Sequence, residues 1–231
     1  GMIKREINSV QKNFSNIEKK LIKKVQKGKK IRVGFFVILD SVFQSHPVFQ
    51  KMLNDDIFEP FIVVIPDTSR GDENMFKQMD KSYKTFSAKY KNVYKSYDED
   101  KQDFIDFTKQ TDIGFFNTPY DFMTHNFYSI EYAGKNNILT IYMSYTLITS
   151  WYLVKTIPTL PSISFCWRIF TDTEFNHQEY LEYSNLKDKN LVLTGYAKMD
   201  ALAGIKREKR QRKKIIIAPH HSMGEHWKKH F

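Results

Sequence analysis

Short apolar runs of strand length recur along this chain and alternate with segments of helical periodicity. Residues 31–39 (IRVGFFVIL) and 61–65 (FIVVI) are runs of apolar residues, interrupted only by Arg32, as is typical of strands buried on both faces of a parallel sheet. We expect further strands at 93–97, 113–116, 139–143, 163–170 and 191–193, and helices at 47–53, 73–90, 100–110, 128–135 and 174–185. This alternation predicts an α/β fold, a Rossmann-like parallel sheet with helices on both faces.

An amphipathic, basic helix is expected to precede the sheet, within residues 1–30. The apolar residues at 3, 7, 10, 14, 17, 21 and 25 form one stripe at helical spacing. The opposite face is rich in lysine. We expect the stripe to dock on the protein's own body; pairing with a second copy and binding to an anionic membrane are the alternatives.

The charge of the chain is concentrated in two places. It has 36 Lys and Arg against 26 Asp and Glu, and the excess of cations gathers at the end of the first helix and between residues 206 and 214. Such clusters suit an anionic partner, either phospholipid headgroups or polyphosphate. Binding to nucleic acid would be supported by the charge alone, so nucleic acid is not a predicted partner. With 41% hydrophobic residues, the chain can bury a core, which excludes a disordered protein.

The sequence favours a cytoplasmic protein, with peripheral binding at the inner face of the cell membrane as an option. The one cysteine, Cys166, cannot form an internal disulfide, and the lysine-rich first thirty residues contain no signal-peptide core. Between Lys135 and Lys155 no residue is charged, but polar side chains recur there, which argues against a membrane span. We expect an aromatic loop around Trp151 and Tyr152 that could contact a lipid-linked substrate.

Candidate catalytic residues follow the first strand. Ligands of open parallel sheets bind beyond the carboxyl ends of the strands, where the chain places Asp40 and His46. We predict His46 as a general base oriented by Asp40, because an imidazole titrates near neutral pH. Alternatively, either residue caps a helix, since Pro47 follows His46 directly.

Candidate substrate-binding residues follow the other strands. Arg70, in a glycine-containing turn, could bind a phosphate through both guanidinium nitrogens; an exposed turn is the alternative. The remaining candidates are Asn117, Tyr120, Asp121, Tyr145, Lys198, His221 and Ser222. No dinucleotide fingerprint, P-loop or zinc-binding His-Glu-x-x-His pattern is present, so we predict neither a cofactor nor a metal.

Residues 191–222 carry a resemblance to a known family. An apolar run is followed by TGYAKMD (194–200), a basic stretch, and a lysine-led apolar run that ends in Ala218-Pro219. This order resembles the middle of the CDP-glycerol glycerophosphotransferases and related capsule and teichoic-acid transferases of the GT-B class. The resemblance implies a Rossmann-like acceptor-side domain at 31–203, a basic tether at 204–214, and the first strand of a truncated donor domain at 215–231.

The resemblance also implies a function. Such enzymes transfer a glycosyl or glycerophosphate unit from a nucleotide-activated donor to a capsule, teichoic-acid or lipid-linked acceptor. The chain would be the N-terminal half of a GT-B fold and inactive by itself. It departs from the family at residues 142–145 (YMSY), where those transferases carry a Trp-His-Gly segment, so a family histidine has no counterpart here. A non-catalytic Rossmann-like binding or scaffold module is the alternative.

Overall fold

The computed structural model describes residues 2–203, 205–206, 212 and 215–217. The chain divides into a compact unit of residues 1–200 and a second unit of residues 201–231. The sheet and the helices that cover it all belong to the first unit. The expected amphipathic helix is part of this unit and does not form a separate domain.

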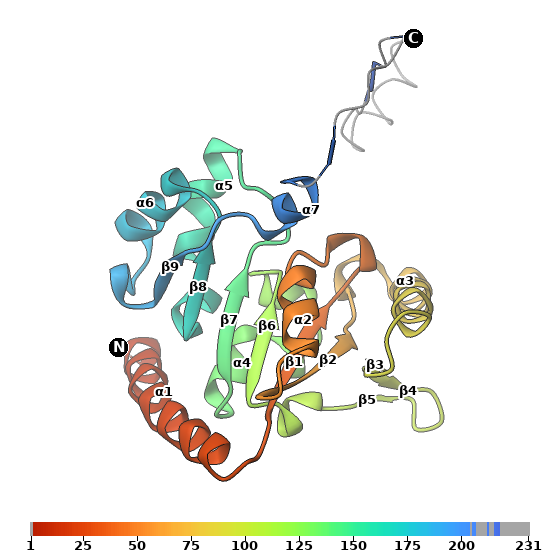
Figure 1. Ribbon diagram of the computed structural model, residues 1–231. Helices are drawn as coiled ribbons and strands as arrows, with labels where there is room; N and C mark the ends of the chain where they lie inside the picture. The colour runs from red at the N-terminus through yellow and green to blue at the C-terminus, as the bar shows by residue number, and fades with distance from the viewer. Residues whose placement is uncertain (1, 204, 207–211, 213–214, 218–231) are drawn as a thin grey trace. The chain divides into compact units, whose positions relative to one another are not determined.

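A seven-stranded parallel sheet forms the centre of the first unit (Figure 1). Its order is β3-β2-β1-β6-β7-β8-β9. The strands are β1 (Ile31–Val37), β2 (Phe58–Val64), β3 (Val93–Lys95), β6 (Ile113–Phe116), β7 (Leu139–Met143), β8 (Arg168–Thr171) and β9 (Leu191–Leu193). The predicted Rossmann-like α/β fold is confirmed.

Strand β1 lies between β2 and β6, and the direction of chain progression reverses there. Val33 of β1 is in register with Pro60 of β2 on one side and with Ile113 of β6 on the other. The connection after β1 leads to β2 and β3, whereas β6 begins the half that continues through β9. This reversal creates the kind of crevice in which open α/β sheets bind their ligands.

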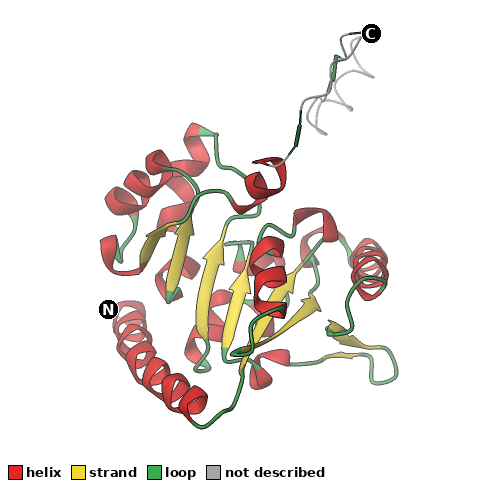
Figure 2. Cartoon of the chain, in the orientation of Figure 1, coloured by secondary structure: helices red, strands yellow, loops and turns green. Residues whose placement is uncertain are grey.

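Helices cover both faces of the sheet, with α2 and α4 on opposite sides (Figures 1 and 2). Aromatic packing fills the space between the layers: Phe35 of β1 stacks on Phe115 of β6 at 4.6 Å between ring centroids and meets Phe49 of α2 edge-on. The helices are α1 (Met2–Gln26), α2 (His46–Leu53), α3 (Asp72–Ser87), α4 (Ile130–Lys135), α5 (Trp151–Thr156), α6 (Glu174–Tyr183) and α7 (Asp200–Ala203).

Short 3-10 helices occupy many of the connections between these elements. They are η1 (Asp40–Val42), η2 (Thr68–Arg70), η3 (Phe107–Gln110), η4 (Asp121–Met123), η5 (Asn126–Tyr128), η6 (Ile157–Thr159), η7 (Pro161–Phe165), η8 (Lys187–Asn190) and η9 (Ala197–Met199). Several follow the carboxyl ends of strands, so they shape the edge of the sheet at which a ligand would bind.

The apolar stripe of α1 packs on the protein's own body, as predicted. Val10, Phe14, Ile17 and Leu21 are all buried in the main hydrophobic core. The helix comes very close to α4, where a Cβ atom added to Gly134 would lie 2.9 Å from the Phe165 carbonyl oxygen and 3.4 Å from Val10. Only glycine therefore fits at this contact without displacing a neighbour.

Hydrogen bonds connect α1 to segments far away in the sequence. The side-chain amide of Gln11 donates to the carbonyl oxygens of Ser164 and Cys166, at 3.0 Å each. The Asn190 amide in turn donates to Gln11 Oε1 at 2.9 Å. Polar groups of two connections, the one before β8 and the one before β9, thereby find hydrogen-bond partners on one helix, which fixes the register of α1 on the sheet.

The predicted helix at 100–110 is wrong. The segment contains a two-stranded antiparallel hairpin, β4 (Tyr97–Asp98) with β5 (Asp103–Phe104), followed by η3. Its aspartates bind nearby backbone amides: Asp98 accepts from Asp100 and Lys101, and Asp106 accepts from Thr108. Such local bonds compete with the hydrogen bonds of a helix, and they decide the conformation here.

Three further expectations are corrected. The aromatic loop expected around Trp151 and Tyr152 is instead the start of the helix α5. The strand predicted at 163–170 begins only at Arg168, because Pro161 opens the 3-10 helix η7. Strand β9 forms as predicted but is not buried, since it lies at the edge of the sheet and exposes Val192 and Leu193. Residues 215–217 are described without strand pairing; most of the expected tether and donor-domain residues lie outside the described residues.

Candidate functional site

The switch point of the sheet is the place where β1 lies between β2 and β6 and the direction of chain progression reverses. A cavity of about 180 Å³ lies at the carboxyl ends of the strands around it. Strand β1 and its continuation supply apolar walls, and polar side chains come from the segments that follow β2, β6 and β7. The lining residues are Phe36, Val37, Ile38, Leu39, Val42, Asp67, Arg70, Asn117, Thr118, Tyr120, Met123 and Tyr145. Four predicted substrate-binding residues, Arg70, Asn117, Tyr120 and Tyr145, therefore share one cavity.

Asn117 is buried and forms hydrogen bonds between two strand ends that border the cavity. Its amide nitrogen donates to the Met143 carbonyl oxygen at 2.9 Å, and its backbone carbonyl accepts from the Tyr145 amide at 3.0 Å. The Ser45 hydroxyl lies 3.5 Å from its side-chain oxygen. These contacts connect the end of β6 to the end of β7. Asn117 therefore lines the cavity and also holds the two strand ends that form its wall.

Two tyrosines, Tyr120 and Tyr145, line the cavity. Burial raises the pKa of Tyr120, and the neighbouring Tyr145 hydroxyl raises it further. The Tyr120 hydroxyl therefore stays protonated at neutral pH and can donate a hydrogen bond to a ligand. The backbone carbonyl of Tyr145 accepts from the side-chain amide of Gln44, which anchors this segment to the loop after β1.

Arg70 and Asp67 form an ion pair in the cavity wall. Asp67 is nearly buried and accepts a hydrogen bond from the Ser69 backbone amide at 3.0 Å, while its second oxygen lies 3.3 Å from Arg70 Nε. The Arg70 side chain is 62% exposed. Asp67 therefore holds one side of the guanidinium, and the other nitrogens remain accessible to an anionic ligand.

The predicted orientation of His46 by Asp40 is not formed. His46 Nε2 lies 2.6 Å from the Tyr90 hydroxyl, and the ring packs edge-on against Phe43. Asp40 instead accepts from the Ser82 hydroxyl at 3.3 Å. Burial, and secondly the charge of Lys89, lower the pKa of His46. Neither candidate lines the cavity, and a catalytic role of His46 stays a prediction.

Asp121 stabilises a helix and does not line the cavity. Its two carboxylate oxygens accept from the backbone amides of Ile130 at 2.8 Å and Glu131 at 3.1 Å, at the start of α4. Burial raises the pKa of Asp121 to about 6, although both amides favour the charged form. The carboxyl group follows Tyr120 directly and so fixes the loop that carries this tyrosine.

Of the last three candidates, Lys198, His221 and Ser222, only Lys198 is among the described residues. Lys198 Nζ donates to the Ser41 carbonyl oxygen at 3.1 Å, which attaches η9 to the loop after β1 but leaves Lys198 outside the cavity lining. His221 and Ser222 lie outside the described residues. Thr118, Met123 and Val42 also line the cavity and were not predicted as site residues, although each follows a strand end and the same rule could have found it.

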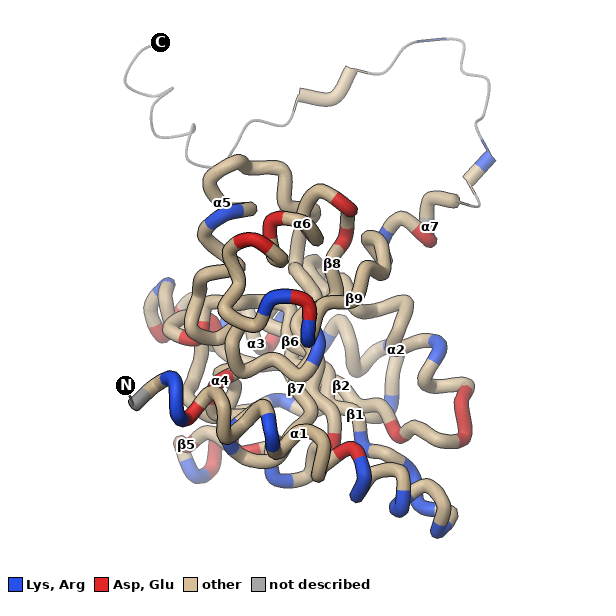
Figure 3. Tube along the Cα trace, turned by 90° about the vertical axis from the view of Figure 1, so that its left-hand side faces the viewer, with Lys and Arg blue, Asp and Glu red and all other residues tan. Residues whose placement is uncertain are grey.

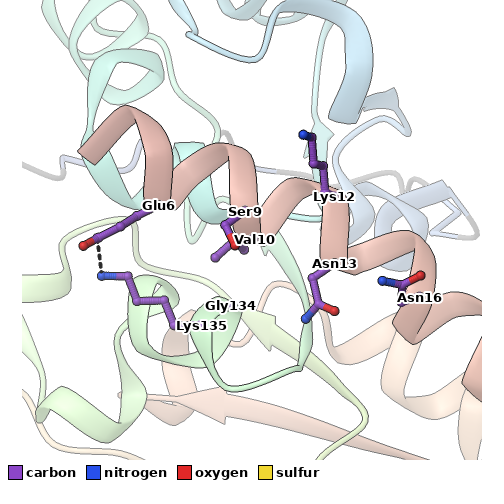
Figure 4. A pocket seen from close by; sticks show the side chains of 8 residues that line it. All are labelled: Glu6, Ser9, Val10, Lys12, Asn13, Asn16, Gly134 and Lys135. Carbon is purple, nitrogen blue, oxygen red and sulfur yellow. Dashed lines mark hydrogen bonds and ion pairs between the residues drawn. The ribbon is translucent and has the colours of Figure 1, made fainter. Parts of the chain in front are cut away.

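A second and larger hollow, about 570 Å³, lies between α1 and α4 (Figure 4). Glu6 of α1 reaches across it to Lys135 of α4, at 2.7 Å. We do not assign the ligand site to it, because it is a surface groove between two helices and lies away from the strand ends. Within the described residues no cluster of three potential metal ligands occurs.

No family model matches the chain, and no curated protein matches it either. The function must therefore be argued from the site. Among the described helices, none is both long enough and apolar enough to cross a bilayer.

Proposed function

We propose that the chain is the acceptor-binding domain of a transferase that moves a glycosyl or glycerophosphate unit from a nucleotide-activated donor to a surface-polysaccharide or lipid-linked acceptor. The observation that carries this proposal is the small cavity at the switch point, with Arg70 in its wall. The resemblance of residues 191–222 to CDP-glycerol glycerophosphotransferases supports it. In this proposal the sheet is the N-terminal half of a GT-B fold.

The size of the cavity favours a small acceptor group. Typical ligand pockets measure about 300–1,000 Å³, whereas this cavity measures about 180 Å³. It suits one glycerol- or sugar-sized unit and is too small for a whole nucleotide. The nucleotide of the donor would then lie outside it, as expected when acceptor and donor are held by different halves of an enzyme.

The lining of the cavity fits a phosphorylated polyol. Hydroxyl groups of Thr118 and Tyr120 can bond the hydroxyls of the acceptor, and the apolar walls formed by Ile38 and Leu39 can cover its carbon atoms. The accessible nitrogens of Arg70 can bind a phosphate group with two parallel hydrogen bonds. The proposed acceptor is therefore a glycerol- or sugar-phosphate unit at the end of a polymer or lipid.

Transfer requires a group that takes the proton of the attacking hydroxyl. Asp67 is the carboxylate of the cavity lining, and we assign it this role: the acceptor oxygen would bond to the transferred carbon or phosphorus, the donor's nucleotide would leave, and Asp67 would accept the proton. His46 stays a predicted base, at a position outside the lining. Cytoplasmic nucleotide-activated donors fit a chain whose one cysteine is buried and unpaired.

An aromatic surface next to the cavity could contact more of the acceptor. Trp151 and Phe175 stack at 6.1 Å, and both are at least half exposed. They begin α5 and α6, and these helices follow β7 and β8 at the sheet edge that contains the cavity. Tyr152, which is 72% exposed, lies close enough to Tyr120 to contribute to its raised pKa.

Calorimetric titration with glycerol 3-phosphate and with sugar phosphates tests the binding site. We expect Arg70→Gln to weaken binding by about tenfold to a hundredfold, because a charge-assisted hydrogen bond contributes about 1.5–3 kcal/mol. Lys77→Gln removes the same charge from the exposed face of α3 and should leave binding unchanged. If neither class of phosphate binds, or if both variants lose affinity equally, the proposed site is wrong.

Transfer assays on the gene product that contains this chain separate the two candidate bases. Asp67→Asn should lower kcat by about a hundredfold or more while acceptor binding persists, and His46→Gln should have a small effect. A large loss of kcat in His46→Gln, with little change in Asp67→Asn, would show that His46 is the base.

The second candidate function is a non-catalytic binding or scaffold module. The separate partners of Asp40 and His46 favour it, since a base without an orienting carboxylate is less well prepared for catalysis. Phosphate binding that depends on Arg70, combined with transfer that is insensitive to both Asp67→Asn and His46→Gln, would support this module over the enzyme.

A further inference from the structure

The outward face of α1 carries cations along its whole length. Arg5, Lys12 and Lys19 are seven residues apart, and Lys23 and Lys27 follow at steps of four, which keeps them on one side of a helix. We define the α1 basic face as these residues together with Lys20: Arg5, Lys12, Lys19, Lys20, Lys23 and Lys27, all of them exposed. Figure 3 shows the basic residues following one another along α1 and its C-terminal end.

Both acidic residues of α1 are engaged with the body of the protein. Glu6 pairs with Lys135 of α4 at 2.7 Å (Figure 4). Glu18 accepts from the indole nitrogen of Trp167 at 2.6 Å and lies 3.5 Å from Arg168. Because both carboxylates pair with groups outside α1, neither of them pairs with the exposed cations of the helix.

The α1 basic face also has no acidic partner from elsewhere in the described part of the chain. The ion pairs that the helix makes there involve Lys24 with Asp112, Glu6 and Glu18, and all three lie toward the body. The six exposed cations therefore form a continuous positive strip, about 33 Å long at 1.5 Å per residue.

We propose that the α1 basic face docks on an anionic lipid surface by electrostatic attraction, without insertion of the helix. Insertion would need a free apolar face, whereas the stripe of α1 is buried in the protein core from Val10 to Leu21, and only Ile3, at its first turn, is exposed. In this proposal the apolar face of α1 packs on the protein, and its basic face binds the lipid headgroups. This inference does not depend on the proposed transferase activity.

The chemistry of the strip favours lipid headgroups over nucleic acid. Five of its six cations are lysines, which act as hydrated point charges suited to a diffuse layer of headgroups; arginine dominates specific recognition of nucleic-acid phosphate and bases. Ile22 lies beside Lys23 on the outer side and is 58% exposed. An exposed isoleucine among lysines is compatible with the lipid interface.

Vesicle sedimentation tests the docking. The chain should bind vesicles of phosphatidylcholine mixed with phosphatidylglycerol and should not bind vesicles of phosphatidylcholine alone. Raising the salt from about 0.1 M to about 1 M shortens the screening length from about 10 Å to about 3 Å, so binding should be lost. Binding to neutral vesicles, or binding that resists salt, would show insertion and overturn the proposal.

Two charge-matched triple variants locate the contact. Lys12→Gln/Lys19→Gln/Lys23→Gln should weaken binding to anionic vesicles by roughly a hundredfold, from about 1 kcal/mol per lysine. The control Lys77→Gln/Lys81→Gln/Lys84→Gln removes the same charge from exposed positions on α3 and should change binding less than threefold. Both variants keep the basic residues 206–214, so the difference between them reports α1.

Circular dichroism should show both variants folded, because all six substituted lysines are exposed. Equal losses in the two variants would mean that only net charge matters and would refute a docking face on α1. Retention of a duplex oligonucleotide as tight as that of anionic vesicles, with the same loss in the α1 variant, would assign the face to nucleic acid instead.

Discussion

The side-chain amide of Asn117 donates a hydrogen bond of 2.9 Å to the carbonyl oxygen of Met143, and so joins the ends of β6 and β7 beneath the candidate cavity. It adds to the bond of 3.0 Å that the Tyr145 amide donates to the Asn117 carbonyl oxygen at the same strand ends. Because both groups are buried, each depends on the other for its hydrogen bond. The stability of the sheet edge and the shape of the cavity therefore rest on the same contact.

Asn117→Ala should destabilise the protein by about 1–3 kcal/mol, because the Met143 carbonyl loses a buried donor. The midpoint of urea unfolding measures this effect, and affinity for glycerol 3-phosphate should fall in the same variant. Asn54→Ala, at an exposed position after α2, is the control and should change stability by less than about 0.5 kcal/mol. Equal stability of the two variants would contradict the role given to Asn117.

The pKa of Asp121 predicts a pH dependence of stability. Burial raises this pKa from 3.8 to about 6 in the folded state, so folding takes up a proton between these values. The contribution of the group is fully present below pH 3.8 and is lost as the pH rises through about 6. The difference between these two pKa values corresponds to about 3 kcal/mol of folding free energy.

Asp121→Asn should remove this dependence, because the amide stays neutral and its oxygen can still accept from the start of α4. The free energy of unfolding of both proteins, measured across this pH range, tests the expectation: the variant should gain stability relative to the natural protein as the pH rises. Parallel curves would show that Asp121 does not titrate differently in the folded and unfolded states.

Gly134 is predicted to tolerate no side chain. A Cβ atom there would lie 2.9 Å from the Phe165 carbonyl oxygen, a backbone atom that cannot rotate away. Gly134→Ala should therefore cost about 1–3 kcal/mol through displacement of α4 from its neighbours. Thermal unfolding measures the loss, with Asn8→Ala on the exposed side of α1 as the control. An unchanged melting temperature would mean that the contact relaxes freely.

The aromatic surface should affect long acceptors more than short ones. Trp151→Ala and Phe175→Ala each remove a ring that could stack on a sugar or polyol unit, and each should weaken binding of an oligomeric acceptor by about twofold to tenfold. Binding of glycerol 3-phosphate alone should not change, because the cavity is intact. Ile57→Ala, at another exposed apolar position, is the control. A loss of affinity for the small ligand would place these rings within the cavity site itself.

The strands of the central sheet could be predicted because their pattern has one physical cause. Residues 113–116 and 139–143 form β6 and β7 as expected, since strands buried on both faces must be apolar throughout. The hairpin at 97–104 could not be predicted in this way. Its conformation depends on hydrogen bonds from Asp98 and Asp106 to nearby amides, which leave no trace in hydrophobic periodicity.

Part of the candidate site followed from the same reasoning. The rule that ligands bind beyond strand ends brought Arg70, Asn117, Tyr120 and Tyr145 together, and all four line one cavity. It could not give the directions of side chains. Asp40 turns to Ser82 and His46 to Tyr90, partners on α3 or just after it, and only the packing of that helix on the sheet determines these contacts.

The hydrogen bonds of Gln11 have a consequence for the order of folding. Its partners Ser164, Cys166 and Asn190 follow it by 153, 155 and 179 residues. During synthesis, α1 cannot reach its final position until the strands on the far side of the sheet have left the ribosome. Until then the apolar stripe of α1 stays exposed, because the surface that buries it has not yet formed. The docking of the first helix is therefore a late and long-range step that slows folding.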